Sequence, residues 1–470
     1  SITGSAIETA NDFWNSTSTC SSKTNYFTLT GTEAGGASAI AVASLIQTGT
    51  TPDTTDVAIS GWTTSAANYI KIWTDPSIGA RHNGKWDDTK YRLEVSAASS
   101  YTRMIHMNTD FVRIDGLQFK ITNNDNDFCR AIGFTNITAN GVFHFSNNIF
   151  NAVFTTTNGD NIFGIIEEAG GTAAQYKIWN NIFYDFNGSG ISSEAGAVIM
   201  YSSNSFVYNN TVNNARRGYA PQGYNYKPIV KNNIAQNCTD GYAGDASYYT
   251  AASDYNISDL AADAPGTNSK NSTTVGFVSI ANRDFHLAAN DSGARDAGPD
   301  LSADINIAFS TDIDGNTRPT SAWDIGADEY TRQVYYSVGT SVADLKNAAT
   351  ITIASGTATF SAAQPNNVGV GDKVTYNTTS IAYISGRTSS TVYSVVTATG
   401  TMPGNVSGQT VDSITRAFNS LSAAEAGAPD ASHLTTSDLV ANNCILNIPC
   451  YGDGADTTAV TIDGWTTGAN

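Results

Sequence analysis

The sequence predicts an all-β protein whose main body is a coiled β-solenoid, and three observations lead to this prediction. Short runs of alternating apolar and polar residues follow one another from about residue 57 to 285, without an interrupting helical period. Two-residue corners, Asn-Asn or Asp-Gly, recur among these runs at intervals of roughly one solenoid turn. The end of the chain also repeats its beginning, which is typical of tandem architectures.

Residues 1–56 are expected to form an N-terminal cap region with a short amphipathic helix. The pattern Ser5-Ala-Ile-Glu8 is a capping box around Ile7, and Ala10 and Trp14 follow on the same face. Such a helix would cover the end of the solenoid, where apolar coil residues and unpaired backbone groups are otherwise exposed.

Residues 57–330 are expected to form the solenoid, with early strands at Tyr69–Trp73, Tyr91–Val95 and Arg103–Met107. Asn suits the later corners because it tolerates left-handed backbone angles and bonds its own backbone. Stacked coils would place one corner Asn above the next, so that their amides form a hydrogen-bonded ladder. Counted from Gly116 at intervals of 32, 33, 29 and 23 residues, the ladder positions are Asn148, Asn181, Asn210 and Asn233.

A β-sandwich with Asn-rich hairpin turns is the alternative fold. It would place strands about every 8–12 residues and join them through Asn-Gly corners. Asn-Asn recurs instead at the spacing of a coil, which favours the solenoid.

In these features the chain resembles the right-handed parallel β-helix proteins of the pectate-lyase-like architecture, in particular the large repetitive bacterial surface proteins. Arg113-Ile-Asp-Gly-Leu-Gln118, the Asn-Asn-Ile corners, and the closing stretches Asp312–Pro319 and Asp324–Tyr330 carry the resemblance over roughly residues 57–330. It implies parallel coils of right-handed sense. It is a poor guide to function, because this fold hosts lyases, hydrolases, adhesins and phage spikes.

Residues 331–408 are expected to form a small β-rich module that connects one solenoid to the next. Strands are expected at Val334–Val338, Lys373–Tyr376 and Thr391–Val396, with strand character also from Ala349 to Phe360. No Pro-rich or low-complexity linker precedes the module, which favours a rigid joint.

Residues 409–470 are expected to hold a cap helix and the first strand of a next unit, as a truncated copy of residues 1–68. Asp412 or Ser413 can cap the helix, and Gly427 can end it. The apolar residues at helical spacing are Val411, Ile414, Phe418 and Leu421.

The internal repeat is most evident between Asp53–Thr64 and Asp456–Thr467. These segments share nine of twelve residues at an offset of 403 residues (456 − 53). A weaker echo relates Ser1-Ile2-Thr3 to Ser413-Ile414-Thr415. The second copy stops within a motif that the first continues, so we expect the sequence to be a window on a longer tandem protein.

Composition narrows the choice of partners. The net charge is −18 and charged residues make up only 14% of the chain. Such a balance disfavours nucleic acid, whose binding depends on Lys and Arg meeting phosphates, and anionic membrane surfaces. The longest largely apolar run, from Ala37 to Ile46, is too short to span a bilayer.

Candidate binding and metal-ligating residues are few. The aromatic stretch between Arg216 and Thr250 is the best candidate for a carbohydrate patch, although its rings would pack a loop equally well. Its residues are Tyr219, Tyr224, Tyr226 and Tyr242. A calcium site is suggested by Asp312, Asp314 and Asn316, spaced like the start of a calcium loop. The Gly of this loop falls at position 4 rather than 6, and the Glu expected at position 12 is absent, since that place is Trp323. An Asp-Gly turn is the alternative, unless Asp324 or Asp328 completes the site.

Catalytic signals are weak. Arg113 and Asp115 share one strand face, as a polysaccharide-processing site requires, but a solvated strand face gives the same pattern. No nucleophile, zinc-hydrolase or nucleotide-binding motif is present, so we expect no enzyme.

The sequence therefore predicts a structural component of an extracellular or cell-surface fibre or layer. Its tandem β-helix units would join end to end, so that its main partner is itself. A polysaccharide-degrading β-helix enzyme and a carbohydrate-binding adhesin are the alternatives, and both would take extracellular polysaccharide as partner.

Overall fold

The computed structural model describes residues 40–47, 49–97, 101–124, 128–155, 161–167, 173–188, 194–341 and 343–468. These residues fall into two compact units: those up to His286 with Gly293–Asn316 and Trp323–Glu329, and those from Tyr330 onward with Leu287–Ser292 and Thr317–Ala322. Within this described part, no helix has the length and apolar character needed to cross a membrane. The cap helix expected around Ile7 lies outside the described residues.

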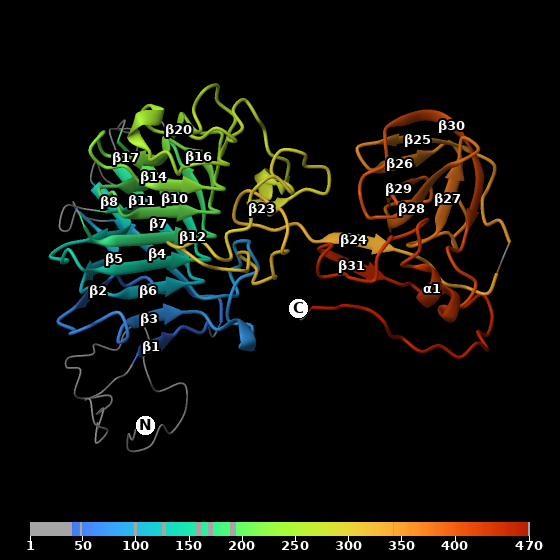
Figure 1. Cartoon of the computed structure of the whole chain (residues 1–470), viewed down its shortest axis with the longest axis horizontal. Helices are drawn as coiled ribbons and strands as arrows, with labels where there is room; N and C mark the ends of the chain where they lie inside the picture. Colours follow the sequence, from blue (N-terminus) through green and yellow to red (C-terminus); the bar gives the residue numbers. More distant parts are fainter. Residues whose placement is uncertain are drawn as a thin grey trace, which may run out of the picture. The chain divides into compact units, whose positions relative to one another are not determined.

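The first unit is built from three parallel sheets of seven strands each (Figure 1). The first sheet contains β1 (Ala41–Ser44), β3 (Ile70–Trp73), β6 (Val112–Asp115), β9 (Val142–Ser146), β12 (Gln175–Trp179), β15 (Ser205–Tyr208) and β18 (Ile229–Lys231). The second contains β4 (Arg92–Ala97), β7 (Gln118–Asn123), β10 (Ile149–Phe154), β13 (Ile182–Phe186), β16 (Thr211–Ala215), β19 (Ile234–Gln236) and β21 (Ile257–Ser258). The third contains β2 (Val57–Ser60), β5 (Arg103–Asn108), β8 (Phe128–Phe134), β11 (Asn161–Ile166), β14 (Gly196–Met200), β17 (Arg217–Pro221) and β20 (Asp240–Tyr242).

The strand order makes this unit a parallel β-helix. From β3 onward the chain visits the first, second and third sheets in turn, so that each coil adds one strand to each sheet. Every pairing within the three sheets is parallel, for example Ile149↔Gln118 and Ile149↔Ile182. The predicted solenoid is confirmed, and the sandwich alternative, which needs antiparallel hairpins, is excluded.

Stacked apolar side chains fill the interior of the coils. Phe119, Phe150 and Phe183 occupy the same position in three successive coils, with ring centroids 4.7 and 4.6 Å apart and nearly parallel planes. All three are fully buried. Burial of such rings favours folding, and the stacking fixes the register between coils.

The predicted Asn ladder is present and runs one coil further than predicted. The backbone N–H of Asn148 donates to Asn181 Oδ1 at 2.9 Å. The same bond then joins Asn181 to Asn210, Asn210 to Asn233 and Asn233 to Asn256, at 2.9, 3.0 and 3.2 Å. Side-chain amides donate along the same line. The ladder satisfies buried polar groups at every corner.

The residue before each ladder position makes the turn. Asn147, Asn180, Asn209 and Asn232 all have left-handed φ angles, between 49 and 56°. Gly116, with φ 81°, takes this turning position in the preceding coil. The sequence prediction aligned Gly116 with Asn148, whereas the strand register aligns it with Asn147.

Short 3-10 helices and a two-stranded sheet also belong to this part of the chain. They are the 3-10 helices η1 (Pro76–Ile78), η2 (Ala246–Tyr248) and η3 (Ile280–Asn282), and the strands β22 (Phe277–Ser279) and β23 (Asp284–Leu287).

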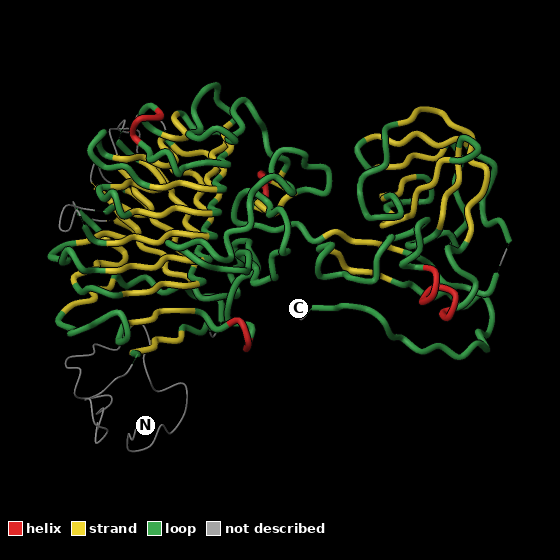
Figure 2. Tube along the Cα trace, in the orientation of Figure 1, coloured by secondary structure: helices red, strands yellow, loops and turns green. Residues whose placement is uncertain are grey.

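The second unit contains a closed antiparallel barrel, and Figure 2 shows that helix is scarce throughout the described chain. The barrel order is β25-β26-β29-β28-β27-β30. The strands are β25 (Thr350–Ala354), β26 (Thr357–Phe360), β27 (Lys373–Tyr376), β28 (Ser380–Arg387), β29 (Val392–Val396) and β30 (Val406–Thr415). The predicted strand at Lys373–Tyr376 is confirmed, but β28 and β30 were not predicted.

The helix predicted to start near Val411 is wrong in its first half, because Val411 and Ile414 belong to strand β30. In the pairing with β27, Tyr376 is opposite Val411 and Thr375 is opposite Ser413, so a β-bulge falls at Asp412. The extra residue turns Val411 and Ile414 to the same side, where both are buried in the barrel. A bulged strand therefore imitates the three-residue spacing of a helix.

The short helix α1 (Leu421–Gly427) follows, with Ser420 accepting a hydrogen bond from Ala423 N–H at its start. It ends at Gly427 as expected. Strand β31 (Cys444–Asn447) pairs in parallel with β24 (Arg332–Tyr335). The strand expected in the repeated segment is absent: residues 460–463 have no strand structure, and Ile462 is 63% exposed.

Candidate functional site

The outward face of the first sheet carries a column of basic side chains. Lys71 of β3 pairs with Arg113 of β6, and Arg113 pairs with His144 of β9. Lys177 of β12 comes next, opposite His144. Paired residues of a parallel sheet project from the same face, so these nitrogen-bearing groups lie along one line across four strands.

A second column runs beside the first, two residues further along each strand. It consists of Trp73, Asp115, Ser146 and Trp179. Most residues of both columns line a cavity of about 340 Å³, which Asn306, Ile307 and Ala308 border from a later loop. We call this cavity the basic groove.

Aromatic rings hold the cations of the groove in place. Lys71 Nζ lies 3.6 Å from the centroid of the Trp73 ring, and Arg113 Cζ lies 3.5 Å from that of Tyr69. Such cation–π contacts orient a charged group without neutralising it. The positive charges therefore remain available to a ligand.

The one acidic residue of the groove is already paired. Asp115 forms an ion pair with Arg81 at 2.7 Å and accepts hydrogen bonds from Ser146 Oγ and Asn147 Nδ2, at 3.1 and 2.7 Å. Among the described residues lining the groove, Asp115 is the only carboxylate. The usual hydrolysis of glycosides uses two carboxylates, and the described lining of this groove supplies one.

The groove is electropositive. Burial, with the charge of Arg113, lowers the pKa of Lys177, and burial followed by Arg113 and Lys177 lowers the pKa of His144 to about 3. Burial is also the main cause that lowers the pKa of Lys71, although Asp115 opposes the shift. A bound anion would relieve the repulsion among these groups, so the groove is suited to a negatively charged ligand.

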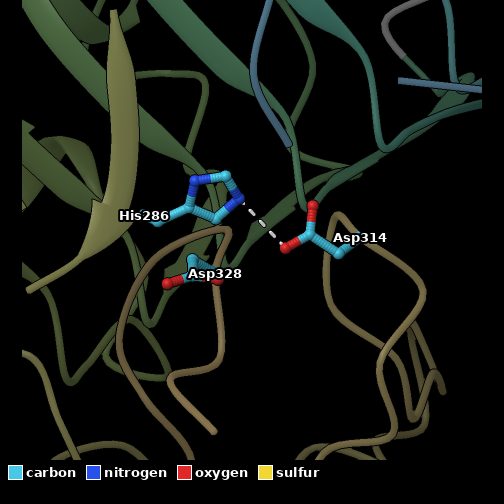
Figure 3. Close-up of side chains that lie close together, drawn as sticks. All are labelled: His286, Asp314 and Asp328. Carbon is cyan, nitrogen blue, oxygen red and sulfur yellow. Dashed lines mark hydrogen bonds and ion pairs between the residues drawn. The ribbon is translucent and has the colours of Figure 1, made fainter. Parts of the chain in front are cut away.

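A separate polar cluster contains His286 of β23, Asp314 and Asp328 (Figure 3). One ligand atom from each residue lies within 4.8 Å of the others. His286 Nε2 is 3.1 Å from Asp314 Oδ2, and its Nδ1 is 2.6 Å from Asp284 Oδ1. The imidazole ring in Figure 3 points toward the Asp314 carboxylate, and Asp328 comes from a neighbouring loop.

The protonation state of His286 affects which ligands this cluster can bind. Burial alone would lower the pKa of His286, but the hydrogen bonds and charges of Asp314, Asp328 and Asp284 outweigh it and raise the pKa to about 10. The ring is therefore a cation that donates from both nitrogens. A metal ion would have to displace one proton, and a nitrogen with two carboxylates suits a transition metal better than calcium.

The residues predicted to bind calcium differ in the contacts that their side chains make. Asp312 is fully buried and accepts hydrogen bonds from the backbone N–H groups of Asp314 and Asn316, at 3.0 and 2.8 Å. Asp312 and Asn316 thus form the Asp-Gly turn, while Asp314 contacts His286. Sequence reasoning missed His286, because it lies 28 residues before Asp314 on a separate strand and no motif links them.

The predicted aromatic patch is mostly internal. Tyr219 and Tyr242 are fully buried, and their hydroxyls donate to backbone carbonyls of Asn210 and Asn233, at 3.0 and 2.8 Å. They pack the coil core and cannot line a surface. Tyr224 is 65% exposed, and Tyr226 is half-buried with its ring 6.0 Å from that of Tyr201.

Comparison with known proteins adds no relative. No family model, no curated protein and no solved structure matches this chain.

Proposed function

We propose that this chain is a structural unit of an extracellular fibre or surface layer, in which tandem β-helix units join end to end. The observation that carries the proposal is the return of Asp53–Thr64 at Asp456–Thr467, after the β-helix and the barrel have been completed. A chain that restarts its own fold is built for repetition along one axis.

The architecture of the first unit supports a mechanical role. Hydrogen bonds along the three sheets, the stacked Phe rings and the Asn ladder all run in the direction in which coils are added. Resistance to extension and bending follows from such continuous ladders. The acidic surface, with a net charge of −18, keeps neighbouring units apart laterally. This is the type of unit found in the large repetitive bacterial surface proteins that the sequence resembles.

Electron microscopy of the natural material tests the proposal. Regular filaments are expected, with an axial repeat that matches the length of one 403-residue unit (456 − 53). Isolated short rods would contradict a fibre or layer.

Binding of an acidic polysaccharide is a second candidate function, and the basic groove is the observation that favours it. Lys71, Arg113 and Lys177 gather three cationic side chains on one face of a protein with a net charge of −18. The ring of Trp179, which lines the groove beside them, suits the apolar face of a sugar ring. A fibre whose units each bind an acidic glycan would combine both functions.

The test is a binding assay with polygalacturonate, using a neutral glucan as reference. The double variant Arg113→Ala with Lys177→Ala is expected to lose binding at least about tenfold, since each lost charge contact is worth about 1 kcal/mol or more. Lys227→Ala is the matched control, because Lys227 is exposed on the same unit and lies outside the groove. Equal binding by all three proteins would exclude the groove as the binding site.

A further inference from the structure

Strand β31 occupies the position of β1 in the sequence repeat. The offset of 403 residues that relates the two copies of the repeat also places Cys444–Asn447 on Ala41–Ser44, the bounds of β31 and β1. This match in bounds shows that the chain begins the same element a second time, in the same register.

The two strands use opposite edges. In β1, the N–H groups of Ala41 and Leu45 donate to β3. In β31, the carbonyls of Asn443 and Asn447 accept from β24. When the offset of 403 is subtracted, these acceptors correspond to residues 40 and 44 of the first copy. Residues 40 and 44 alternate along the strand with the donors at 41 and 45. Because successive residues of a strand direct their backbone groups to opposite sides, β24 lies on the edge that β1 does not offer to β3.

The alternation continues beyond β31. Val338 N–H donates to Pro449 O, and Tyr451 N–H donates to Val338 O, so odd-numbered residues face the β24 side from 443 to 451. The opposite edge begins with Cys444, whose N–H donates locally to Leu439 O. After Cys444, the next residues with backbone groups on this edge are Leu446 and Ile448. They correspond to residues on the side of β1 that faces β3.

The inward side chains correspond as well. Ala41 and Trp62 pack against the core of the β-helix, and the residues 403 positions later, Cys444 and Trp465, pack into a core of the second unit. That core also contains Tyr383 of the barrel and Ala428 after α1. In the second copy, residues of the barrel and after α1 thus pack against Cys444 and Trp465. The equivalents of these two residues in the first copy face the interior of the β-helix.

We propose that β31 is the first strand of a second β-helix, and that its edge opposite β24, which carries Leu446 and Ile448, accepts a parallel strand equivalent to β3, Ile70–Trp73, from a second unit of the same kind. The joint between units is then a continuous sheet, β24–β31–β3, in which β24 of one unit caps the β-helix of the next. This inference rests on the proposed structural function and names the contact through which units join.

The mirror of this joint is the outer edge of β1. Val42 and Ile46 are 54% and 51% exposed there, while their counterparts Ile445 and Pro449, next to β24, are half-buried. In a joined assembly, a strand equivalent to β24 would lie beside these residues.

The experiment uses a two-unit chain in which residues 68–470 are joined directly after Asn470, because position 470 corresponds to position 67 of the first copy. Ile445→Cys is combined with Lys71→Cys in the added segment, in analogy with the direct pairing of Val42 with Lys71. Rapid disulfide formation between these two positions is expected. The matched control combines Ile445→Cys with Ile72→Cys, where a slip of one residue turns the side chains to opposite faces.

A second measurement follows backbone exchange. In the two-unit chain, hydrogen exchange in residues 456–467 is expected to slow by about tenfold or more relative to the present chain, as the segment becomes a paired strand. A folded two-unit chain without the cross-link, or with the slipped one, overturns the proposal.

A further control covers failure to fold. Here the full second copy, from residue 40 onward, is attached through a flexible Gly-Ser linker and keeps its own β1. If this control folds both units but the directly joined chain does not, β31 cannot replace β1 and the proposal is wrong. If the cross-link forms but natural material shows no filaments, the joint stands and the fibre function fails.

Discussion

The two copies of the repeated segment have nearly the same sequence and different structures. In the first copy, β2 pairs with β5 in the register Val57↔Ile105, and Ile59 is 6% exposed. In the second, the equivalent residues have no strand, and Ile462 is 63% exposed. The neighbours of the two copies differ: β2 lies beside β5, whereas residues 460–463 have no strand partner among the residues that the structure describes. Strand structure in this protein is therefore a property of the stack rather than of the segment.

Strands β1 and β31 provide a second comparison between the two copies. Both copies form a strand here, and in both a parallel partner lies beside it: β3 for β1 and β24 for β31. A repeated segment is a strand where it has a partner and a coil where it has none. Substitutions can test this dependence on partners, and they are given in order of decreasing expected change in stability.

Asn181→Ala should weaken the stack most. The side chain accepts from Asn148, and donates to Phe145 O and Trp179 O, so its loss leaves several buried polar groups unpaired. A loss of about 4 kcal/mol in the stability of the β-helix is expected from two or more such groups, measured by urea unfolding. Asn282→Ala, at an exposed residue, should change stability by less than about 0.5 kcal/mol. Equal effects of the two substitutions would refute the structural role of the ladder.

Ile59→Ala and Ile462→Ala compare the copies directly, since the two residues are equivalent in the repeat. Ile59 is buried in the β-helix, so its truncation should cost about 2–3 kcal/mol. Ile462 is mostly exposed, so the same change there should stay within about 0.5 kcal/mol. Thermal unfolding of both variants provides the measurement. Similar losses at both sites would show that the second copy is packed as well.

Glu167→Gln tests a buried corner of the stack through pH. Burial raises the pKa of Glu167 from 4.5 to about 8, although hydrogen bonds from Ser205, Tyr201 and Ser202 oppose the shift. The native state thus retains a proton that the unfolded state releases, so stability falls as pH rises through this window. Gln cannot ionise, and the variant should be more stable than the parent at pH 8.5 by on the order of 2 kcal/mol, with little difference at pH 4.5. Parallel stability profiles across this range would show that Glu167 is not buried as a neutral acid.

The sequence predicted the features that repeat and missed those that depend on distant contacts. Asn148 to Asn233 were identified because coil spacing and corner chemistry agree at each position. Asn256 was missed because its corner reads Tyr-Asn rather than Asn-Asn. The bulge near Asp412 was read as a helix, since spacing alone does not distinguish the two.

The candidate sites were harder to predict, for a related reason. Each residue of the basic column sits on a different strand, so Lys71, Arg113 and Lys177 come together only through the register of the sheet. The same applies to His286 and Asp314. The buried Tyr219 and Tyr242 show the reverse error, because a cluster of aromatic residues in sequence fills a core as readily as it lines a surface.

Hydrogen exchange of this chain, followed by mass spectrometry, tests most directly whether the repeated segment forms a strand only beside a partner strand. Peptides from residues 53–64 and 456–467 report on the same sequence in two settings. We expect strong protection around β2 in the first copy and fast exchange throughout residues 460–463 in the second. Equal protection of both copies would contradict this expectation, because residues 460–463 would then be ordered without a strand partner such as the one that β2 has in β5.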